Sequence, residues 1–404
     1  MSNRQGVWSL AAQYQAIADT NWTMAPGAPT GVAGTAGNAQ VSVAFTAPTF
    51  AGIPATITEF KVTSSEGETA TGTSSPIVVT SLTNGTAHTF TVQAQNAIGL
   101  GKASDASSSV TPIAPQVALY LTSNTNLDQF DMTASGNATD FGTISLGEGT
   151  SRGSVSSATR YVLSAYEDGN TLTYVTIASA GNGTDFGDAS QQATGPAGLN
   201  SSTRGIFCGG IASSTRQNFM DYITIASTGN GQDFGNLTSG SQRAAGACSP
   251  TRGVVGGGFR VASSGASNVM DYVTIASTGN ATDFGDLTQV CNNGLAGFSS
   301  NTRGIFGSLH NNSTPSNVIN YITIASAGNG QDFGDLAVSV YSTTGFSNKI
   351  SGFFAGGVGA GGGTNEIQKI TIATTGNATD FANSTNSSSG VGAGNSGSHG
   401  GIAA

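Results

Sequence analysis

Short stretches in which apolar and polar residues alternate recur along most of the chain. Val41, Val43 and Phe45 alternate with polar or small residues, and Phe90 and Val92 do the same. A period of two is typical of half-buried β-strands. Pairs such as Asn84-Gly85 separate these stretches and favour tight turns. The pattern predicts an all-β protein of short strands, in which long helices are not expected.

A strand–turn–strand unit repeats at long range in the C-terminal part. Tyr222 to Leu237 is nearly identical to the stretches that begin at Tyr174, Tyr272 and Tyr321, and looser copies begin at Phe130 and Lys369. The aspartate of an Asp-Phe pair recurs in all six copies, at Asp140, Asp185, Asp233, Asp283, Asp332 and Asp380. A spacing of 40–50 residues is typical of four-stranded propeller blades.

These repeats predict a six-bladed β-propeller over residues 114–404. The final Gly400-Gly401-Ile402 is similar to the start of a repeat, and the first copy begins within one. We therefore expect both ends of the segment to complete one blade, which removes a free sheet edge. An open solenoid is the alternative, and it would need capped ends instead.

The composition of the chain narrows the classes of binding partner. Charged residues make up 9% of the chain, 59 of its 404 residues are glycine, and the net charge is −9. No Lys/Arg cluster is present, so we expect no nucleic-acid partner. No apolar run is long enough to span a bilayer, and the first residues do not resemble a secretory signal, so we expect neither membrane insertion nor a signal peptide.

Residues 25–113 resemble a fibronectin type III module. Pro26 and Pro29 precede the first strand, the stretch 82–94 has the pattern of the module's later strands, and 96–101 matches its last hairpin. The resemblance implies a β-sandwich that acts as a spacer without chemistry. Phe45 stands where the family often has tryptophan, and His88 stands where it has a corner tyrosine.

The repeats resemble Kelch-type propellers and, at residues 227–234, a degenerate Asp box. The second resemblance implies that the Asp-Phe aspartates are structural and accept backbone N–H bonds across the turn. A tandem calcium repeat is excluded, because its nine-residue copies would have to be adjacent. A single oxygen-ligand site formed by Asn230, Asp233 and a carbonyl stays open as an alternative.

Four arginines that each precede a glycine form a second repeated set: Arg152, Arg204, Arg252 and Arg303. We expect a structural ladder in which each arginine bonds a carboxylate or carbonyls of the neighbouring blade, with the Asp-Phe aspartates or Asp188, Asp286 and Asp335 as the favoured partners. The alternative is a basic cluster that binds an anionic sugar.

Catalytic patterns are sparse. Outside the sandwich the glutamates are Glu148, Glu167 and Glu366, and none lies in a motif that pairs two carboxylates. The three histidines are scattered, and Cys208, Cys248 and Cys291 have neither the spacing of a metal site nor the even count of a disulfide framework. We expect a protein that is not an enzyme and that has no metal and no cofactor.

Residues 1–24 predict a leader with a short helix and three aromatic residues suited to docking, Trp8, Tyr14 and Trp22. Leader, module and repeats together resemble virion structural proteins of tailed marine bacteriophages. The resemblance implies a tail fibre or a head or neck decoration, present in many copies. Its leader would contact other virion proteins and its propeller a host surface glycan. A cellular adhesin or glycan-binding protein, or a glycan-processing propeller enzyme, is the alternative.

Overall fold

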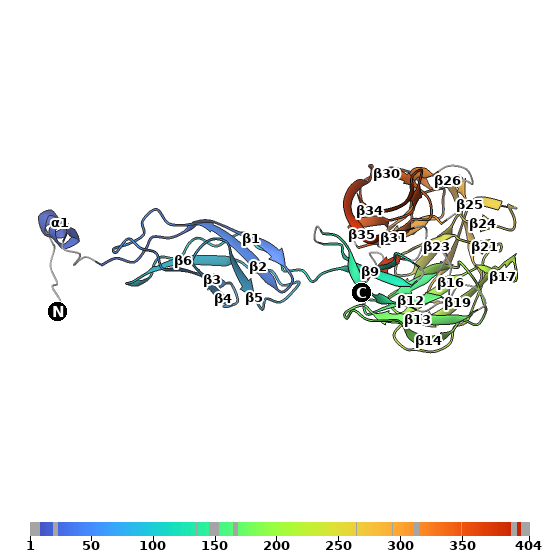
Figure 1. Cartoon of the computed structure of the whole chain (residues 1–404), viewed down its shortest axis with the longest axis horizontal. Helices are drawn as coiled ribbons and strands as arrows, with labels where there is room; N and C mark the ends of the chain where they lie inside the picture. The colour runs from blue at the N-terminus through green and yellow to red at the C-terminus, as the bar shows by residue number, and fades with distance from the viewer. Residues whose placement is uncertain are drawn as a thin grey trace. The chain divides into compact units, whose positions relative to one another are not determined.

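The structure is a computed structural model, and it divides the chain into two units, Met1–Pro115 and Gln116–Ala404. It describes residues 9–18, 23–123, 125–133, 136–144, 153–164, 169–263, 265–292, 294–310, 315–348, 350–388 and 394–396. The described part is all-β apart from one short helix, α1 (Leu10–Ala18). The prediction of an all-β protein is therefore confirmed (Figure 1).

Unit 1 contains two antiparallel sheets, whose strands follow α1 in the sequence. The first has the order β1-β2-β5 and the second the order β4-β3-β6-β7. Their strands are β1 (Thr30–Gly37), β2 (Gln40–Thr46), β3 (Glu59–Ser64), β4 (Thr69–Gly72), β5 (Ile77–Thr80), β6 (Phe90–Asn96) and β7 (Gly99–Leu100). The alternating residues Val41, Val43, Phe90 and Val92 are fully buried in one core shared by both sheets.

Met24, one residue before the predicted boundary at residue 25, is bonded to the body of unit 1. Its carbonyl accepts hydrogen bonds from the Ile53 amide and from the Asn96 side chain, and Met24 and Ile53 form a bridge outside the named strands. Tyr14 lies on α1 and is 70% exposed. Trp8 and Trp22 lie outside the described residues. No helix in the described ranges is long and apolar enough to cross a membrane.

Unit 2 consists of six antiparallel sheets, numbered here from sheet 1 to sheet 6, with short strands added at some loops. Sheet 1 is β36 (Gly394–Ser396), β8 (Val117–Leu121), β9 (Asn126–Asp131) and β10 (Thr139–Thr143); sheet 2 is β11 (Ser154–Ser156), β12 (Arg160–Ser164), β13 (Thr171–Thr176) and β14 (Thr184–Asp188); sheet 3 is β15 (Ala197–Asn200), β16 (Arg204–Cys208), β19 (Phe219–Thr224) and β20 (Gln232–Asn236).

The remaining sheets follow the same plan. Sheet 4 is β22 (Ala245–Cys248), β23 (Arg252–Gly256), β25 (Gly265–Thr274) and β26 (Thr282–Cys291); sheet 5 is β27 (Ala296–Ser299), β28 (Arg303–Gly307), β29 (Ser316–Thr323) and β30 (Gln331–Val340); sheet 6 is β31 (Thr344–Ser347), β32 (Ser351–Ala355), β34 (Gly362–Thr371) and β35 (Thr379–Ser388). The added strands are β17 (Ile211–Ala212), β18 (Thr215–Arg216), β21 (Ser241–Gln242), β24 (Phe259–Arg260) and β33 (Val358–Gly359).

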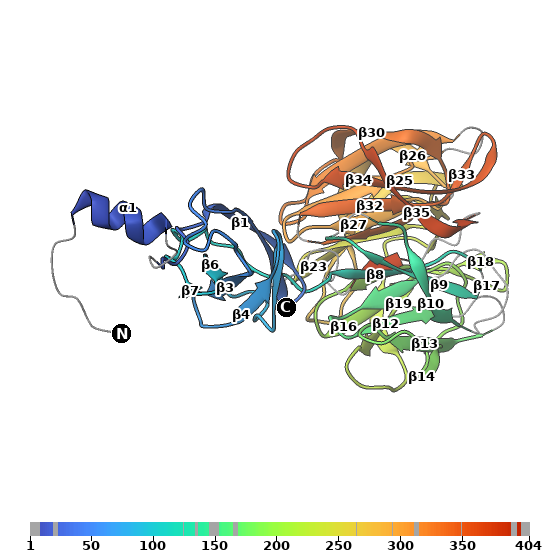
Figure 2. The ribbon, with the colours of Figure 1, turned by 60° about the vertical axis from the view of Figure 1, so that its left-hand side comes forward.

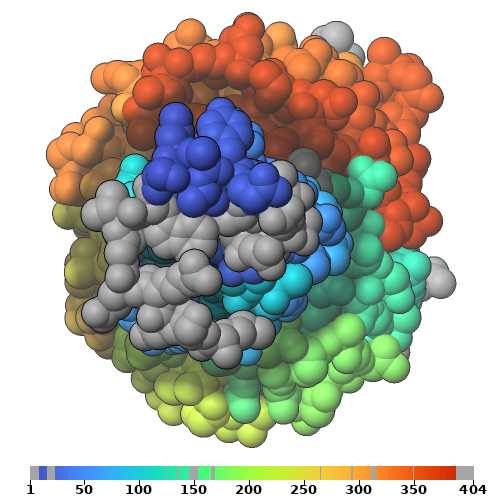
Figure 3. Space-filling model, turned by 90° about the vertical axis from the view of Figure 1, so that its left-hand side faces the viewer, coloured from blue at the N-terminus to red at the C-terminus, as the bar shows by residue number. Residues whose placement is uncertain are grey.

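The first strands of successive sheets touch one another. β11 contacts β15, and the series continues through β22, β27, β31 and β36 back to β11. The colours of unit 2 accordingly run round its outline in chain order (Figure 3). The strands approach closely at glycines, because a Cβ on Gly246 would lie 2.0 Å from the Gly198 carbonyl oxygen. Neighbouring first strands are thus in close backbone contact at this level.

Apolar side chains fill the spaces between neighbouring sheets. Ile206 and Met220 of sheet 3 form one cluster with Val255 and Val273 of sheet 4. Sheets 6 and 1 pack in the same way through aromatic rings. Phe130 makes an edge contact with Phe353 at 5.3 Å between ring centroids, and Tyr120 stacks on Phe346. The last sheet thus contacts the first as other neighbours contact each other.

Candidate functional site

The six sheets of unit 2 have two chemically different ends. We call one the invariant end: it holds the turns between first and second strands and between third and fourth strands. We call the other the variable end: it holds the loops between second and third strands and the links to the next sheet. Antiparallel pairing requires this separation, because consecutive connections alternate between the two ends of a sheet.

Near-identical turns build the invariant end. In sheets 2 to 5 a serine hydroxyl accepts the amides two and three residues later, as Ser201 does from Thr203 and Arg204. The equivalent serines are Ser157, Ser249 and Ser300. In sheet 6 the Asn348 side chain accepts the same two amides. The sequence motif Ser-x-Thr-Arg therefore marks a serine-capped turn that ends in an arginine.

The arginines of these turns connect neighbouring sheets. Arg204 donates from Nη1 to the carbonyls of Ile275 and Ala276 in sheet 4, both at 2.9 Å. Its guanidinium also lies 4.4 Å from the centre of the Tyr222 ring. Arg160, Arg252 and Arg303 repeat both contacts in their own sheets. Each guanidinium is thus held between a ring of its own sheet and carbonyls of the next.

This geometry corrects two details of the predicted ladder. The partners are carbonyls and tyrosine rings, and the favoured carboxylates, whether the Asp-Phe aspartates or Asp188, Asp286 and Asp335, take no part. Arg160 occupies the position in sheet 2 that the sequence analysis gave to Arg152, which lies outside the described residues. Arg160 does not precede glycine, but the Ser-x-Thr-Arg motif identifies it.

The Asp-Phe aspartates do not carry the predicted turn bonds. All six are exposed, and in the described part of the chain their carboxylates accept no hydrogen bond. The asparagine of the preceding turn has that role instead. Asn329 accepts the Asp286 amide at 3.0 Å, and the Gly330 amide donates to the Asp286 carbonyl at 2.8 Å.

This asparagine clamp joins every sheet to the one before it. The other five asparagines are Asn137, Asn182, Asn230, Asn280 and Asn377. Asn137 accepts the amide of Asn383, so the clamp also joins sheet 1 to sheet 6. Because Asn230 already accepts the Asp188 amide, and the Asp233 side chain lies exposed, this turn is explained by the fold without a bound cation.

The third strands carry a row of buried polar residues that the sequence did not predict. Asp221 is 2% exposed and accepts the Ser190 amide at 2.7 Å and the Ser190 hydroxyl at 2.6 Å. Burial raises the pKa of the Asp221 carboxyl, and it does the same to Asp128. Equivalent residues accept from the fourth strand of the preceding sheet or from the link after it: Asp128, Asp271, Asn320 and Gln368. The sequence pattern of these positions is weak, because the residue type changes from sheet to sheet.

The variable end carries loops of different length and structure. The loop between second and third strands runs from four residues in sheet 1 (122–125) to ten in sheet 3 (209–218). In sheet 3 it forms the β17–β18 hairpin, and in sheet 4 β24 pairs with β21. β17, β18 and β33 lie on the same side of unit 2 (Figure 2).

Strained backbone also gathers at the variable end. The non-glycine residues of unit 2 described with positive φ are Ser213, Ser214, Arg243, Ser308 and Ser342. All five lie in loops or links of this end. Such conformations cost free energy and concentrate at functional sites.

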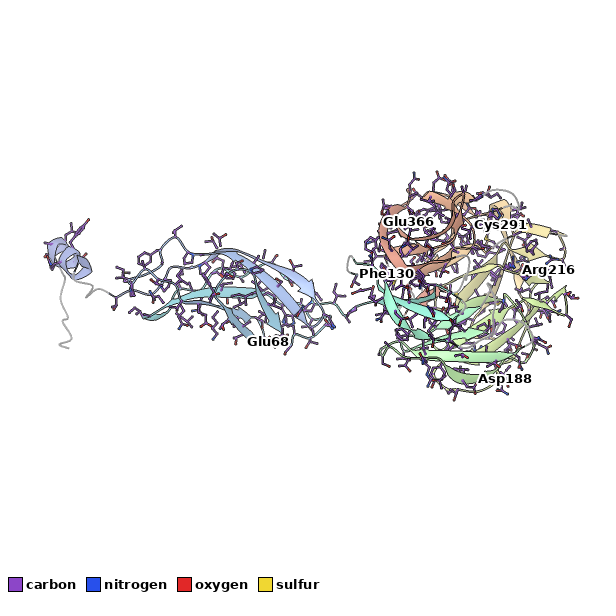
Figure 4. The ribbon with its side chains drawn as sticks, viewed as in Figure 1. Glu68, Phe130, Asp188, Arg216, Cys291 and Glu366 are labelled. Atoms are coloured by element: carbon purple, nitrogen blue, oxygen red, sulfur yellow. The ribbon has the colours of Figure 1, made fainter. Side chains whose placement is uncertain are left out.

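Arg216, Arg243 and Arg260 all belong to the variable end of sheets 3 and 4. The Arg216 guanidinium lies 4.9 Å from the centre of the Phe259 ring, and Phe259 pairs with Gln242 beside Arg243. Arg260 is buried and forms a 2.8 Å ion pair with Asp271. Val261, at the tip, is 52% exposed. Figure 4 labels Arg216 at this edge of unit 2. We call Arg216, Arg243, Phe259 and Val261 the arginine patch.

Other reactive groups are poorly placed for catalysis. Burial raises the pKa of the thiols of Cys248 and Cys291 to about 12, so these cysteines stay protonated and act as packing residues. Glu148 and Glu167 lie outside the described residues, and Glu366 is half-buried on β34. Two open hollows flank the turns 227–232 and 277–282 at the invariant end, with volumes of about 380 and 220 Å³. Equivalent residues of the scaffold line both.

Comparisons with known proteins add no identification. No protein-family model matches the chain, and the search of curated proteins gave no match.

Proposed function

We propose that unit 2 is a closed six-bladed β-propeller and that residues 23–115 form a sandwich of the fibronectin type III kind. The return of the first-strand contacts to β11, the clamp from Asn137 to sheet 6 and the completion of sheet 1 by β36 support the propeller. The two sheets of three and four strands around one core support the sandwich.

We propose further that the protein is a non-enzymatic surface appendage of a bacteriophage virion, whose propeller binds a host surface glycan. One observation carries the binding role: repeated side chains at the invariant end are used in contacts between sheets, whereas the loops of the variable end vary in length and sequence among the sheets. A rigid scaffold that presents diverse loops is the usual arrangement of a binding protein. Many copies on one particle would offset weak binding by each.

The arginine patch indicates the class of glycan. Guanidinium groups on an otherwise acidic chain favour a carboxylate-bearing sugar, because Arg binds carboxylates through two parallel hydrogen bonds. Phe259 and Val261 supply apolar surface beside these charges. We therefore expect acidic bacterial polysaccharides that contain uronic acids to bind better than neutral ones.

Binding can be tested with the full chain displayed on beads against purified acidic and neutral bacterial polysaccharides. Arg216→Ala should lower retention on the acidic polymers at least tenfold. Lys102→Ala removes an exposed charge from unit 1 and should leave retention unchanged. Equal retention by Arg216→Ala and the unaltered chain would overturn the assignment of the patch, and no retention on any polymer would overturn the glycan role.

The virion role has its own test. A cryo-EM map of the native assembly that contains this chain should show it on a phage particle, attached through its N-terminal segment. Deletion of residues 1–22 should leave a folded protein that is not incorporated, since Met24 already belongs to unit 1. Incorporation of the truncated protein would show that the anchor lies elsewhere, and a map without a particle would favour the cellular adhesin.

A further inference from the structure

We propose that unit 1 contains a binding site for a divalent transition-metal ion, formed by Glu66, Glu68 and His88. One ligand atom from each of these residues lies within 4.8 Å of the other two. Two carboxylates and one imidazole are a common ligand set for zinc and manganese, with further positions left for water. The site is separate from the arginine patch, and its existence does not depend on the function proposed above.

Both carboxylates come from one short turn between β3 and β4. The Ser64 hydroxyl accepts the amides of Glu66, Gly67 and Glu68 at 3.1–3.2 Å and donates to the Glu68 carboxylate. These hydrogen bonds fix the Glu68 carboxylate on the turn before any ion arrives, which reduces the cost of binding. Figure 4 labels Glu68 on this turn.

His88 reaches the carboxylates from the neighbouring chain segment. Its amide and carbonyl pair with those of Val110, and Thr89 exchanges hydrogen bonds with Ser65 of the turn. The backbone thus fixes the imidazole beside the turn from both sides. The 21 residues between Glu66 and His88 in the sequence conceal this arrangement, which is why the scattered histidines gave no metal signal.

The burial of the His88 imidazole and its lack of hydrogen-bond partners in the described part of the chain indicate that it binds a metal ion. His88 is fully buried, and neither Nδ1 nor Nε2 has a hydrogen-bond partner among the described residues. A buried polar atom without a partner costs about 1–3 kcal/mol. A metal ion on the nitrogen nearest the glutamates would remove the penalty at that atom and neutralise both carboxylates.

The burial of the three ligands suits an ion that enters from solvent. Glu66 is exposed and Glu68 is half-buried, so the carboxylates face water while the imidazole closes the inner side. The mixed nitrogen and oxygen ligands favour zinc over magnesium or calcium, which bind oxygen sets, and the Irving–Williams order places zinc above manganese.

The test is calorimetric titration of the full chain with ZnCl₂, together with the visible spectrum of the chain loaded with CoCl₂. We expect one site that Glu66→Gln weakens at least tenfold, with the cobalt d–d bands lost in parallel. Glu66→Gln changes an exposed side chain and should not affect folding. Glu59→Gln on β3 is the matched control, outside the cluster, and should bind as the unaltered chain does.

His88→Tyr is the second variant, and it should abolish the site while retaining an aromatic ring in the core. Zinc should raise the melting temperature of unit 1 in the unaltered chain and in Glu59→Gln only. The proposal is overturned if millimolar zinc produces no binding heat, or if binding persists unchanged in both Glu66→Gln and His88→Tyr.

Discussion

The two ends of the sheets in unit 2 use the same residue type for opposite purposes. At the invariant end Arg252 is held between the Tyr272 ring and the carbonyls of Ile324 and Ala325. At the variable end Arg216 lies on Phe259, and the matching hairpin of sheet 6 has Gly363 in its place. Repetition therefore marks side chains that hold the sheets together, and departure from repetition marks those available for other contacts.

The largest effect is expected where the asparagine clamp meets the preceding sheet. Gly285 has a φ of +133°, and a Cβ there would lie 2.6 Å from the Gly328 carbonyl oxygen. Gly285→Ala should lower the free energy of unfolding by about 3 kcal/mol, through backbone strain and overlap together. Gly279→Ala is the control, because its Cβ would meet nothing within 4 Å. Equal denaturant midpoints for the two variants would show that the clamp is not a rigid contact.

Replacement of Arg252 and of Arg216 by alanine, one at a time, should separate the effect on stability from the effect on binding. Arg252→Ala removes two charge-assisted hydrogen bonds and a cation–π contact, and should lower the free energy of unfolding by about 2 kcal/mol. Arg216→Ala should change it by less than about 0.5 kcal/mol and should instead reduce retention on acidic polysaccharides. Chemical denaturation and bead retention measure the two effects. A reversed outcome would mean that the ends have been assigned the wrong way round.

The buried carboxylates should give the scaffold a pH dependence. Because burial raises the pKa of Asp221, its folded form holds a proton that the unfolded chain has already released. Its contribution is therefore full below the ordinary pKa of an aspartate and is lost as the pH rises through the folded pKa. Asp221→Asn, which reproduces the amide that sheet 5 has at Asn320, should flatten this part of the stability–pH curve. An unchanged curve would assign the dependence to other carboxyls.

The smallest effect is expected at the tip of the β17–β18 hairpin. Ser213 and Ser214 have φ values of 47° and 63°, which favour asparagine and glycine. The double change Ser213→Asn and Ser214→Gly should raise the free energy of unfolding by about 0.5–1 kcal/mol. Thermal unfolding measures the gain. A loss of stability would indicate that the Ser213 and Ser214 side chains make stabilising contacts, which this backbone conformation is needed to form.

The regular features of unit 2 were predictable from the sequence, because each repeat restates them. The Asp-Phe spacing located one strand of each sheet in unit 2. In unit 1, alternating residues such as Val41 and Val43 marked buried strands. The arginine ladder was predictable only in part. A backbone carbonyl is present at every residue, so no sequence pattern identifies Ile275 as the partner of Arg204.

The remaining features depend on contacts between distant segments. Asp221 was missed because its equivalents are Asp271, Asn320 and Gln368, which share a hydrogen-bond role and no residue type. The prediction that the Asp-Phe aspartates bond the turn was wrong for the opposite reason: these residues are invariant in type, but their side chains are exposed to solvent. The arginine patch arises only when the loops of two sheets fold against each other.

The pairing of β36 with β8 has a consequence for synthesis. A ribosome produces Val117 to Thr143 well before Gly394 to Ser396, so the strand that completes sheet 1 is absent while the strands of sheets 2 to 6 are made. Until it emerges, β8 presents an unpaired edge that other nascent chains on the same messenger can join. Products truncated before Gly394 would keep that edge permanently, and proteolysis or chaperones would have to remove them.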